Sequence, residues 1–370
     1  MLQPESSLQE ECLRSMEDEL NSIRKFRSSG GKTLGYLCRG FPPSLAAGLG
    51  FRPVRVLQEA SVEMEDLGGK LARQDICPLI KAFMGGIESS RGLFEMIDVW
   101  MGLATCDQTR RCFSALADME DVTVHHVQLP ATRSQSAGKY FSDQLQQFCH
   151  DCRNLYGFEY SAERALGYSM NLWIAGDILR TATLSAKISP LDLHWLFHLF
   201  LIADPDGLAE ILLGLLKRAE PFSPDCMIAI AGGPLALEDT WVLQAVQSKN
   251  AGVIPLHCTG LQMFPFGDLN GIPVTGTIEE LAGRAFGDIR CARSRPNTEI
   301  FQYINDSISD TSSDGLILKT LKFCDLWFTE RERFRSSMNV PVLVLDTSYG
   351  RGDAERQRNR VDAFLETLAL

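Results

Sequence analysis

The chain has 370 residues, 45% of them hydrophobic, so it is long enough to bury more than one core and to form about two or three domains. Its formal net charge of −11 argues against a nucleic-acid-binding protein, because contacts with phosphates need a basic face. No apolar run reaches the roughly 18 to 20 residues of a membrane span and the first residues are polar and rich in glutamate, so we expect a cytoplasmic protein without membrane contact.

Residues 1–30 predict an N-terminal helical segment, because apolar residues recur at helical spacing up to Arg27 and a serine- and glycine-rich stretch follows. Residues 31–134 predict a first α/β domain, in which helical stretches alternate with short apolar runs at 33–38, 54–57, 97–105 and 122–129. This alternation is typical of a parallel sheet that helices cover on both faces.

Residues 135–222 contain few strand-like runs and many helical ones, such as 165–180 and 208–219, and predict a helical connector. Residues 223–370 predict a second α/β domain that ends in a helix, with apolar runs at 226–231, 252–257, 316–323 and 340–346. The sequence therefore predicts an α/β protein with two open, Rossmann-like parallel-sheet domains joined by a helical segment. Any cofactor is expected in the cleft between them.

The eleven cysteines lack the dense spacing of a secreted disulfide framework, so we expect reduced thiols. Cys106 and Cys324 each follow the third apolar run of a domain, and an aspartate comes next in both cases, Asp107 and Asp325. Ligands of open α/β sheets bind beyond the carboxyl ends of strands, which makes both thiols candidates for a site. Cys77 precedes a proline suited to the first turn of a helix, where a thiol ionises more easily. Thiolates are the ligands of iron in clusters.

Other patterns have simpler structural explanations. The Gly-Lys-Thr at 31–33 lacks the leading glycine and the preceding strand of a phosphate-binding loop. Cys149 and Cys152 form a Cys-x-x-Cys pair without a second pair, which favours a packed helix face. His194 and His198 share a helical face, but the glutamate of a zinc-protease helix is absent, so aromatic packing is favoured.

Three further interpretations concern single residues. Cys38 ends the first predicted strand, where burial without function is the simpler explanation and a place beside a cluster is the alternative. The adjacent His125 and His126 point to opposite faces of a strand and cannot readily share a metal. The arginines near the C-terminus fit CoA phosphates or a solvated helical turn: Arg351, Arg356, Arg358 and Arg360. We interpret the remaining cysteines as packing residues: Cys12, Cys112, Cys226, Cys258 and Cys291.

A more specific signal comes from seven stretches, which are 35–43 (GYLCRGFPP), 49–55 (LGFRPVR), 75–81 (DICPLIK), 105–110 (TCDQTR), 321–330 (LKFCDLWFTE), 340–343 (VPVL) and 357–366 (QRNRVDAFLE). In this order they resemble the motifs of the 2-hydroxyacyl-CoA dehydratase and benzoyl-CoA reductase family, and the chain resembles its component D subunits. The chain departs from the family at Pro43 and Ser44, where relatives often carry an acidic residue, so we expect no acid–base role there.

The resemblance implies a [4Fe–4S] cluster on Cys77, Cys106 and Cys324, with Cys38, Asp107 and Asp325 beside it. It implies a lyase, or a related low-potential reductase, whose open iron is the reacting centre. Its partners would be a homologous second subunit and a separate ATP-hydrolysing activator that supplies one electron, and a ketyl-type radical would form on a CoA-thioester substrate.

Two alternatives stay open. One is a homodimeric reductase of small molecules that carries a double-cubane iron–sulfur cluster. The other is the electron-relay subunit of a heterodimer whose partner performs the reaction. The substrate is not readable from the sequence, because the residues of an acyl pocket come from loops that the sequence alone does not place.

Overall fold

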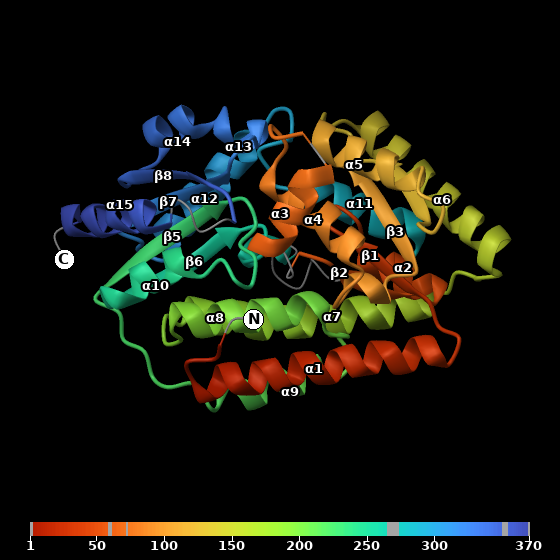
Figure 1. Ribbon diagram of the computed structural model, residues 1–370, viewed down its shortest axis with the longest axis horizontal. Coiled ribbons are helices and arrows are strands. Elements are labelled where there is room, and N and C mark those ends of the chain that lie inside the picture. Colours follow the sequence, from red (N-terminus) through yellow and green to blue (C-terminus); the bar gives the residue numbers. More distant parts are fainter. Residues whose placement is uncertain (1–2, 58–60, 72, 265–273, 350–353, 369–370) are drawn as a thin grey trace.

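The computed structural model describes residues 3–57, 61–71, 73–264, 274–349 and 354–368. It has two parallel four-stranded sheets, each flanked by helices (Figure 1). The first sheet has the order β2-β1-β3-β4 and consists of β1 (Thr33–Tyr36), β2 (Arg52–Arg55), β3 (Val99–Ala104) and β4 (Val124–Gln128). The second has the order β6-β5-β7-β8 and consists of β5 (Cys226–Gly232), β6 (Ala251–His257), β7 (Gly315–Leu321) and β8 (Val342–Thr347).

The two sheets share one strand plan, in which the chain starts at an inner strand, moves outward on one side and then crosses to the other side. The crossing point lies between β1 and β3 in the first sheet and between β5 and β7 in the second. In open α/β sheets the loops diverge at such a switch point and leave a crevice beyond the carboxyl ends of the strands. The fold class predicted from the sequence is confirmed, and each of the eight apolar runs overlaps a strand.

The helices of the first half and of the connector are α1 (Ser7–Ser28), α2 (Pro43–Leu49), α3 (Val62–Leu71), α4 (Pro78–Ser89), the short 3₁₀ turn η1 (Phe94–Met96), α5 (Asp107–Ala117), α6 (Gln135–Tyr156), α7 (Ala162–Leu184), α8 (Pro190–Ile202) and α9 (Leu208–Leu216). In Figure 1, α7 and α8 run beneath both sheets and α1 lies below them. Asp192 of α8 holds the start of α1 in position. The Asp192 carboxylate accepts hydrogen bonds from Ser6 Oγ at 2.7 Å and from Gln9 Nε2 at 2.8 Å.

The second half contains α10 (Trp241–Ser248), the 3₁₀ turn η2 (Leu261–Met263), α11 (Ile278–Gly287), α12 (Thr298–Asp310), α13 (Asp325–Phe328), α14 (Arg331–Ser337) and α15 (Ala354–Thr367). Although α11 belongs to this half of the sequence, it packs on α6, where Leu281 joins a hydrophobic cluster with Phe141 and Leu145. The chain after α11 therefore runs between the two halves. None of the described helices has the length and hydropathy that a membrane-spanning segment needs.

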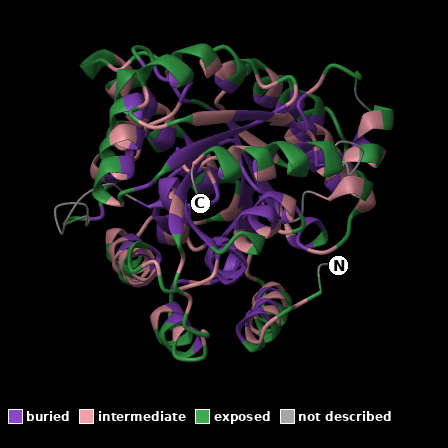
Figure 2. Ribbon diagram, turned by 90° about the vertical axis from the view of Figure 1, so that its left-hand side faces the viewer, coloured by how far each residue is buried: buried purple, intermediate pink, exposed green. Residues whose placement is uncertain are grey.

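One hydrophobic core connects the two sheets. Its largest cluster contains Val54 and Trp100 of the first sheet together with Ala229 and Leu316 of the second. Every residue of α8 is buried in this region. Figure 2 shows the same distribution, with buried residues concentrated in the strands and the helices next to them. The two halves thus form one packed body, which holds the loops between the sheets in fixed positions.

The helix α4 is fixed by a close crossing with α3. A Cβ atom added to Gly85 of α4 would lie 2.0 Å from the main-chain oxygen of Met64, and one added to Gly68 of α3 would lie 1.8 Å from that of Lys81. Only glycine allows the two backbones to approach this closely. The crossing thereby positions the first residues of α4, which follow Cys77.

Candidate functional site

A cavity of about 340 Å³ lies where the carboxyl ends of the two sheets face each other. Its lining comes from the loops that follow β1, β2, β3, β5, β6 and β7, so both halves of the chain build it. Six cysteines line this space, which we call the cysteine cavity: Cys38, Cys77, Cys106, Cys258, Cys291 and Cys324. They are more than half of the eleven cysteines of the chain, and each is a free thiol.

The structure brings together the three cysteines that the sequence singled out. Cys77, Cys106 and Cys324 are separated by up to 247 residues in sequence yet line the same cavity. Asp107 and Asp325 line it as well, but both are exposed to solvent. Their function as metal ligands or as neighbouring groups stays a prediction.

Three further cysteines share the cavity. Cys38, which the sequence left between packing and function, follows β1 by two residues. Cys258 and Cys291 were interpreted as packing residues, although Cys258 directly follows β6 and so satisfies the strand-end rule that selected Cys106. Cys291 lies in the irregular segment between α11 and α12, where no sequence pattern marks it.

Each of the three predicted cysteines begins a helix. Cys77 precedes α4 with Pro78 in its first turn, as expected, and Cys106 precedes α5. The Cys106 sulfur accepts a hydrogen bond from the main-chain N–H of Thr109 at 3.3 Å. Cys324 precedes the short α13, after a residue with a left-handed backbone. The N–H groups at a helix start favour negative charge on a nearby sulfur.

The side chain of Gln108 connects the three predicted cysteine segments. It belongs to α5, two residues after Cys106. Its Oε1 accepts a hydrogen bond from the main-chain N–H of Cys77 at 2.6 Å, and its Nε2 donates to the main-chain oxygen of Phe323 at 2.9 Å. Because Phe323 immediately precedes Cys324, one amide holds all three segments at a fixed separation.

Burial disfavours the ionised form of these thiols. It raises the pKa of Cys324 to about 11, an effect that the main-chain N–H of Trp327 opposes. Burial also raises the pKa values of Cys77, Cys258 and Cys291. In the metal-free chain these thiols are therefore protonated at neutral pH, and a metal that binds them has to displace their protons.

The cavity wall carries more positive than negative charge. Three of its arginines donate to main-chain oxygens: Arg293 Nε to Thr105 at 3.0 Å, Arg39 Nη1 to Gln262 at 2.7 Å, and Arg55 Nε to Leu37 at 2.9 Å. The wall contains two aspartates and four arginines, which are Arg39, Arg55, Arg290 and Arg293. Such a lining favours an anionic occupant.

The other candidates of the sequence lie elsewhere. Cys149 and Cys152 are buried in the hydrophobic cluster on α6. The rings of His194 and His198 lie 4.4 Å apart inside the fully buried α8. Of the arginines near the C-terminus, Arg351 lies outside the described residues, and Arg360 donates a hydrogen bond to the main-chain oxygen of Val344 at 2.8 Å.

Two parallel sheets flanked by helices, with a thiol-lined cavity at their switch points, define an α/β protein with two Rossmann-like domains. The family described as 2-hydroxyglutaryl-CoA dehydratase, D-component matches residues 38–368, and the chain belongs to this family. This confirms the resemblance that the sequence motifs indicated and places the chain among dehydratase components. A search of curated proteins found no match.

Proposed function

We propose that the chain is the iron–sulfur component of a 2-hydroxyacyl-CoA dehydratase or of a related ATP-dependent CoA-ester reductase. The observation that carries this proposal is the convergence of Cys77, Cys106 and Cys324 on one cavity in a chain of the dehydratase D-component family. We propose these three thiolates as the ligands of a [4Fe–4S] cluster.

The residues that line the cysteine cavity fit an iron–sulfur cluster better than a single metal ion. Among the described residues, no set of three or more histidine, cysteine or acidic side chains is spaced to hold one metal ion. Six thiols spread around about 340 Å³ instead suit a larger, sulfur-bridged cofactor. Gln262 Nε2 is buried at the cavity wall without a hydrogen-bond partner in the described part of the chain, and it offers a donor to an anionic occupant.

A [4Fe–4S] cluster with three thiolate ligands has one iron open to a substrate oxygen, where it supplies a Lewis-acid and one-electron centre. The chain's own residues prepare the cavity for it. The main-chain N–H of Thr109 donates to the Cys106 sulfur, and the main-chain N–H groups of Leu79 and Ile80 favour a thiolate at Cys77. Arg290 and Arg293 supply positive charge against the negative charge of a thiolate-bound cluster.

A separate ATP-hydrolysing activator and a homologous second subunit belong to the same proposal. Phe323 and Phe328 next to Cys324 support an approach of a partner from this side, since 46% and 38% of their surfaces are exposed. Large apolar side chains that remain exposed beside a cofactor cavity suit a transient contact.

A double-cubane cluster is the second candidate, and one observation favours it. Beyond the three predicted ligands, the cavity presents a second set of three thiols, Cys38, Cys258 and Cys291. Two linked cubanes would engage both sets. Such a cluster would make the chain a low-potential reductase of a small molecule.

Iron and sulfide analysis of protein purified without oxygen tests the proposal and separates the two candidates. One [4Fe–4S] cluster predicts about four iron and four sulfide per chain, and a double cubane predicts about twice that iron content. Freshly isolated protein with neither iron nor acid-labile sulfide would contradict both.

Gln108→Leu is expected to weaken cluster binding about ten- to hundredfold, because it removes both hydrogen bonds that hold the cysteine segments. The rate of iron release to a chelator under nitrogen measures this change. Gln108→Glu keeps an acceptor for the Cys77 N–H, so its rate of iron release should fall between those of the wild type and Gln108→Leu. Wild-type release from the leucine variant would show that Gln108 does not position the ligands.

A further inference from the structure

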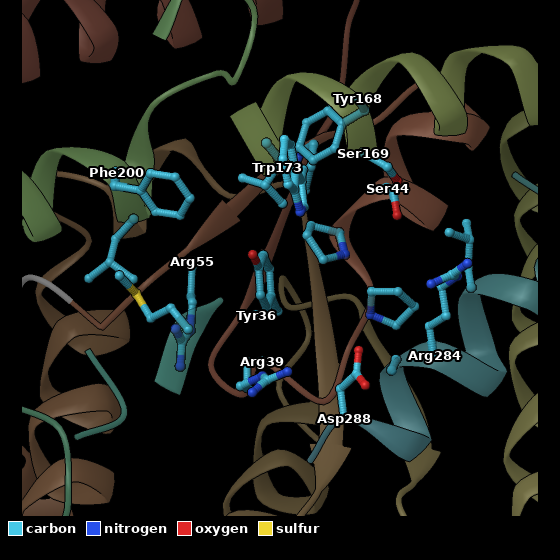
Figure 3. A pocket seen from close by; sticks show the side chains of 18 of the residues that line it. Tyr36, Arg39, Ser44, Arg55, Tyr168, Ser169, Trp173, Phe200, Arg284 and Asp288 are labelled. Carbon is cyan, nitrogen blue, oxygen red and sulfur yellow. The ribbon is translucent and has the colours of Figure 1, made fainter. Parts of the chain in front are cut away.

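A second pocket of about 140 Å³ adjoins the cysteine cavity (Figure 3). It lies between the start of α2, the helices α7 and α8, and α11. Figure 3 shows aromatic rings at one end, with Tyr168 and Trp173, and charged groups toward the other, with Arg39 and Asp288. The pocket thus has an apolar side and a charged side.

Two arginines belong to both spaces. Arg39 and Arg55 line the pocket as well as the cysteine cavity, so they form the wall that the two share. A molecule in the pocket would therefore lie directly beside whatever the six thiols hold. This adjacency suits a reactant that has to reach the cofactor while its remaining atoms stay in the pocket.

The guanidinium of Arg55 is buried and has few hydrogen-bond partners. Only 5% of its surface is exposed, at the carboxyl end of β2. Its Nε donates to the main-chain oxygen of Leu37 at 2.9 Å, and no other hydrogen bond or ion pair involves its side chain within the described ranges. A buried charge without a counter-charge is costly, and the cost is offset when a ligand supplies an anion. The Nη atoms of Arg55 are thus the strongest unpaired donors at this wall.

We propose that the pocket binds a compact organic monocarboxylate through the two Nη atoms of Arg55. The statement that this molecule is the substrate of the reaction rests on the proposed function, whereas its binding to the pocket does not. The planar guanidinium matches the two oxygens of a carboxylate in one plane.

The size and charge of the pocket restrict its occupant. A volume of about 140 Å³ admits a compact organic molecule. Trp173 and Phe200 line the apolar side and suit a short aliphatic or aromatic body. The carboxylate of Asp288 lies in the same pocket and disfavours a doubly charged anion such as phosphate.

Titration of cluster-free protein with acetate, butyrate and benzoate tests the proposal, with Trp173 fluorescence as the readout. Butyramide serves as the neutral analogue of butyrate, and inorganic phosphate serves as the competing anion. We expect saturable signals from the carboxylates that vanish in Trp173→Phe, and none from butyramide or phosphate. Arg55→Met should weaken butyrate binding roughly ten- to hundredfold. Arg284→Met removes a charge from the same pocket that Glu280 already pairs at 3.1 Å, so it should weaken binding less.

Several results would overturn the proposal. One is equal butyrate affinity of Arg55→Met and the wild type. Another is tighter binding of phosphate than of butyrate, and a third is the absence of any fluorescence response that depends on Trp173. A loss of iron from Arg55→Met with unchanged carboxylate binding would assign Arg55 to the cofactor alone. Iron analysis of the wild type is a separate measurement, so failure of the proposed function is distinguished from failure of this inference.

Discussion

Cys324→Ala is expected to abolish stable cluster binding, because a site reduced to two thiolates holds iron poorly. The protein purified without oxygen should lose the broad visible absorption of an iron–sulfur cluster, together with most of its iron and sulfide. Cys77→Ala and Cys106→Ala should have the same effect, since their thiols line the same cavity.

The matched control is Cys112→Ala. Cys112 lies in α5, the helix that Cys106 begins, but it is buried in the hydrophobic core and does not line the cavity. This variant should keep the full iron content. Retention of the cluster by all three variants in the cavity would refute the ligand assignment, and its loss from Cys112→Ala would show that the assay reports folding.

Lys319→Met is expected to lower the free energy of unfolding by about 3–5 kcal/mol, because it leaves the carboxylate of Asp239 buried without a counter-charge. The two side chains are 2% and 3% exposed, and Lys319 Nζ donates to Asp239 Oδ2 at 2.6 Å. Burial raises the pKa of Asp239, and the charge of Lys319 opposes that rise. Urea denaturation of cluster-free protein, followed by circular dichroism, measures the loss.

The pair holds the loop after β5 against β7. Main-chain atoms approach closely here, since a Cβ atom on Gly232 would lie 2.1 Å from the Lys319 oxygen, and the next residues, Gly233 and Pro234, line the cysteine cavity. The double variant Lys319→Met, Asp239→Leu should recover most of the stability, because it buries no unpaired charge. A single variant within about 1 kcal/mol of wild type would show that the pair does not stabilise the fold.

The strand plan was predictable because parallel strands are buried on both faces. All seven residues of β7 are buried, so the sequence shows an apolar run there that only Lys319 and Thr320 interrupt. The only partly buried β4 lies within the predicted run 122–129, because Val124 and Val127 still mark it among polar residues. The loops that follow β3 and β7 then located Cys106 and Cys324 at the carboxyl edges of their sheets.

The rest of the site depends on tertiary structure. Cys258 follows β6 directly but lacks the aspartate that marks the two predicted strand-end cysteines, and Cys291 reaches the cavity only because α11 packs on the first half. The pocket beside Arg55 is closed by α7 and α8, whose positions beneath the sheets follow from long-range packing. Local sequence patterns do not encode such contacts.

Diffraction from crystals grown without oxygen, recorded on both sides of the iron absorption edge, tests the central claim most directly. The account predicts anomalous density inside the cysteine cavity, in contact with the sulfurs of Cys77, Cys106 and Cys324. Density that extends to Cys38, Cys258 and Cys291 would select the double cubane. Iron-containing protein whose anomalous density lies outside this cavity would contradict the account.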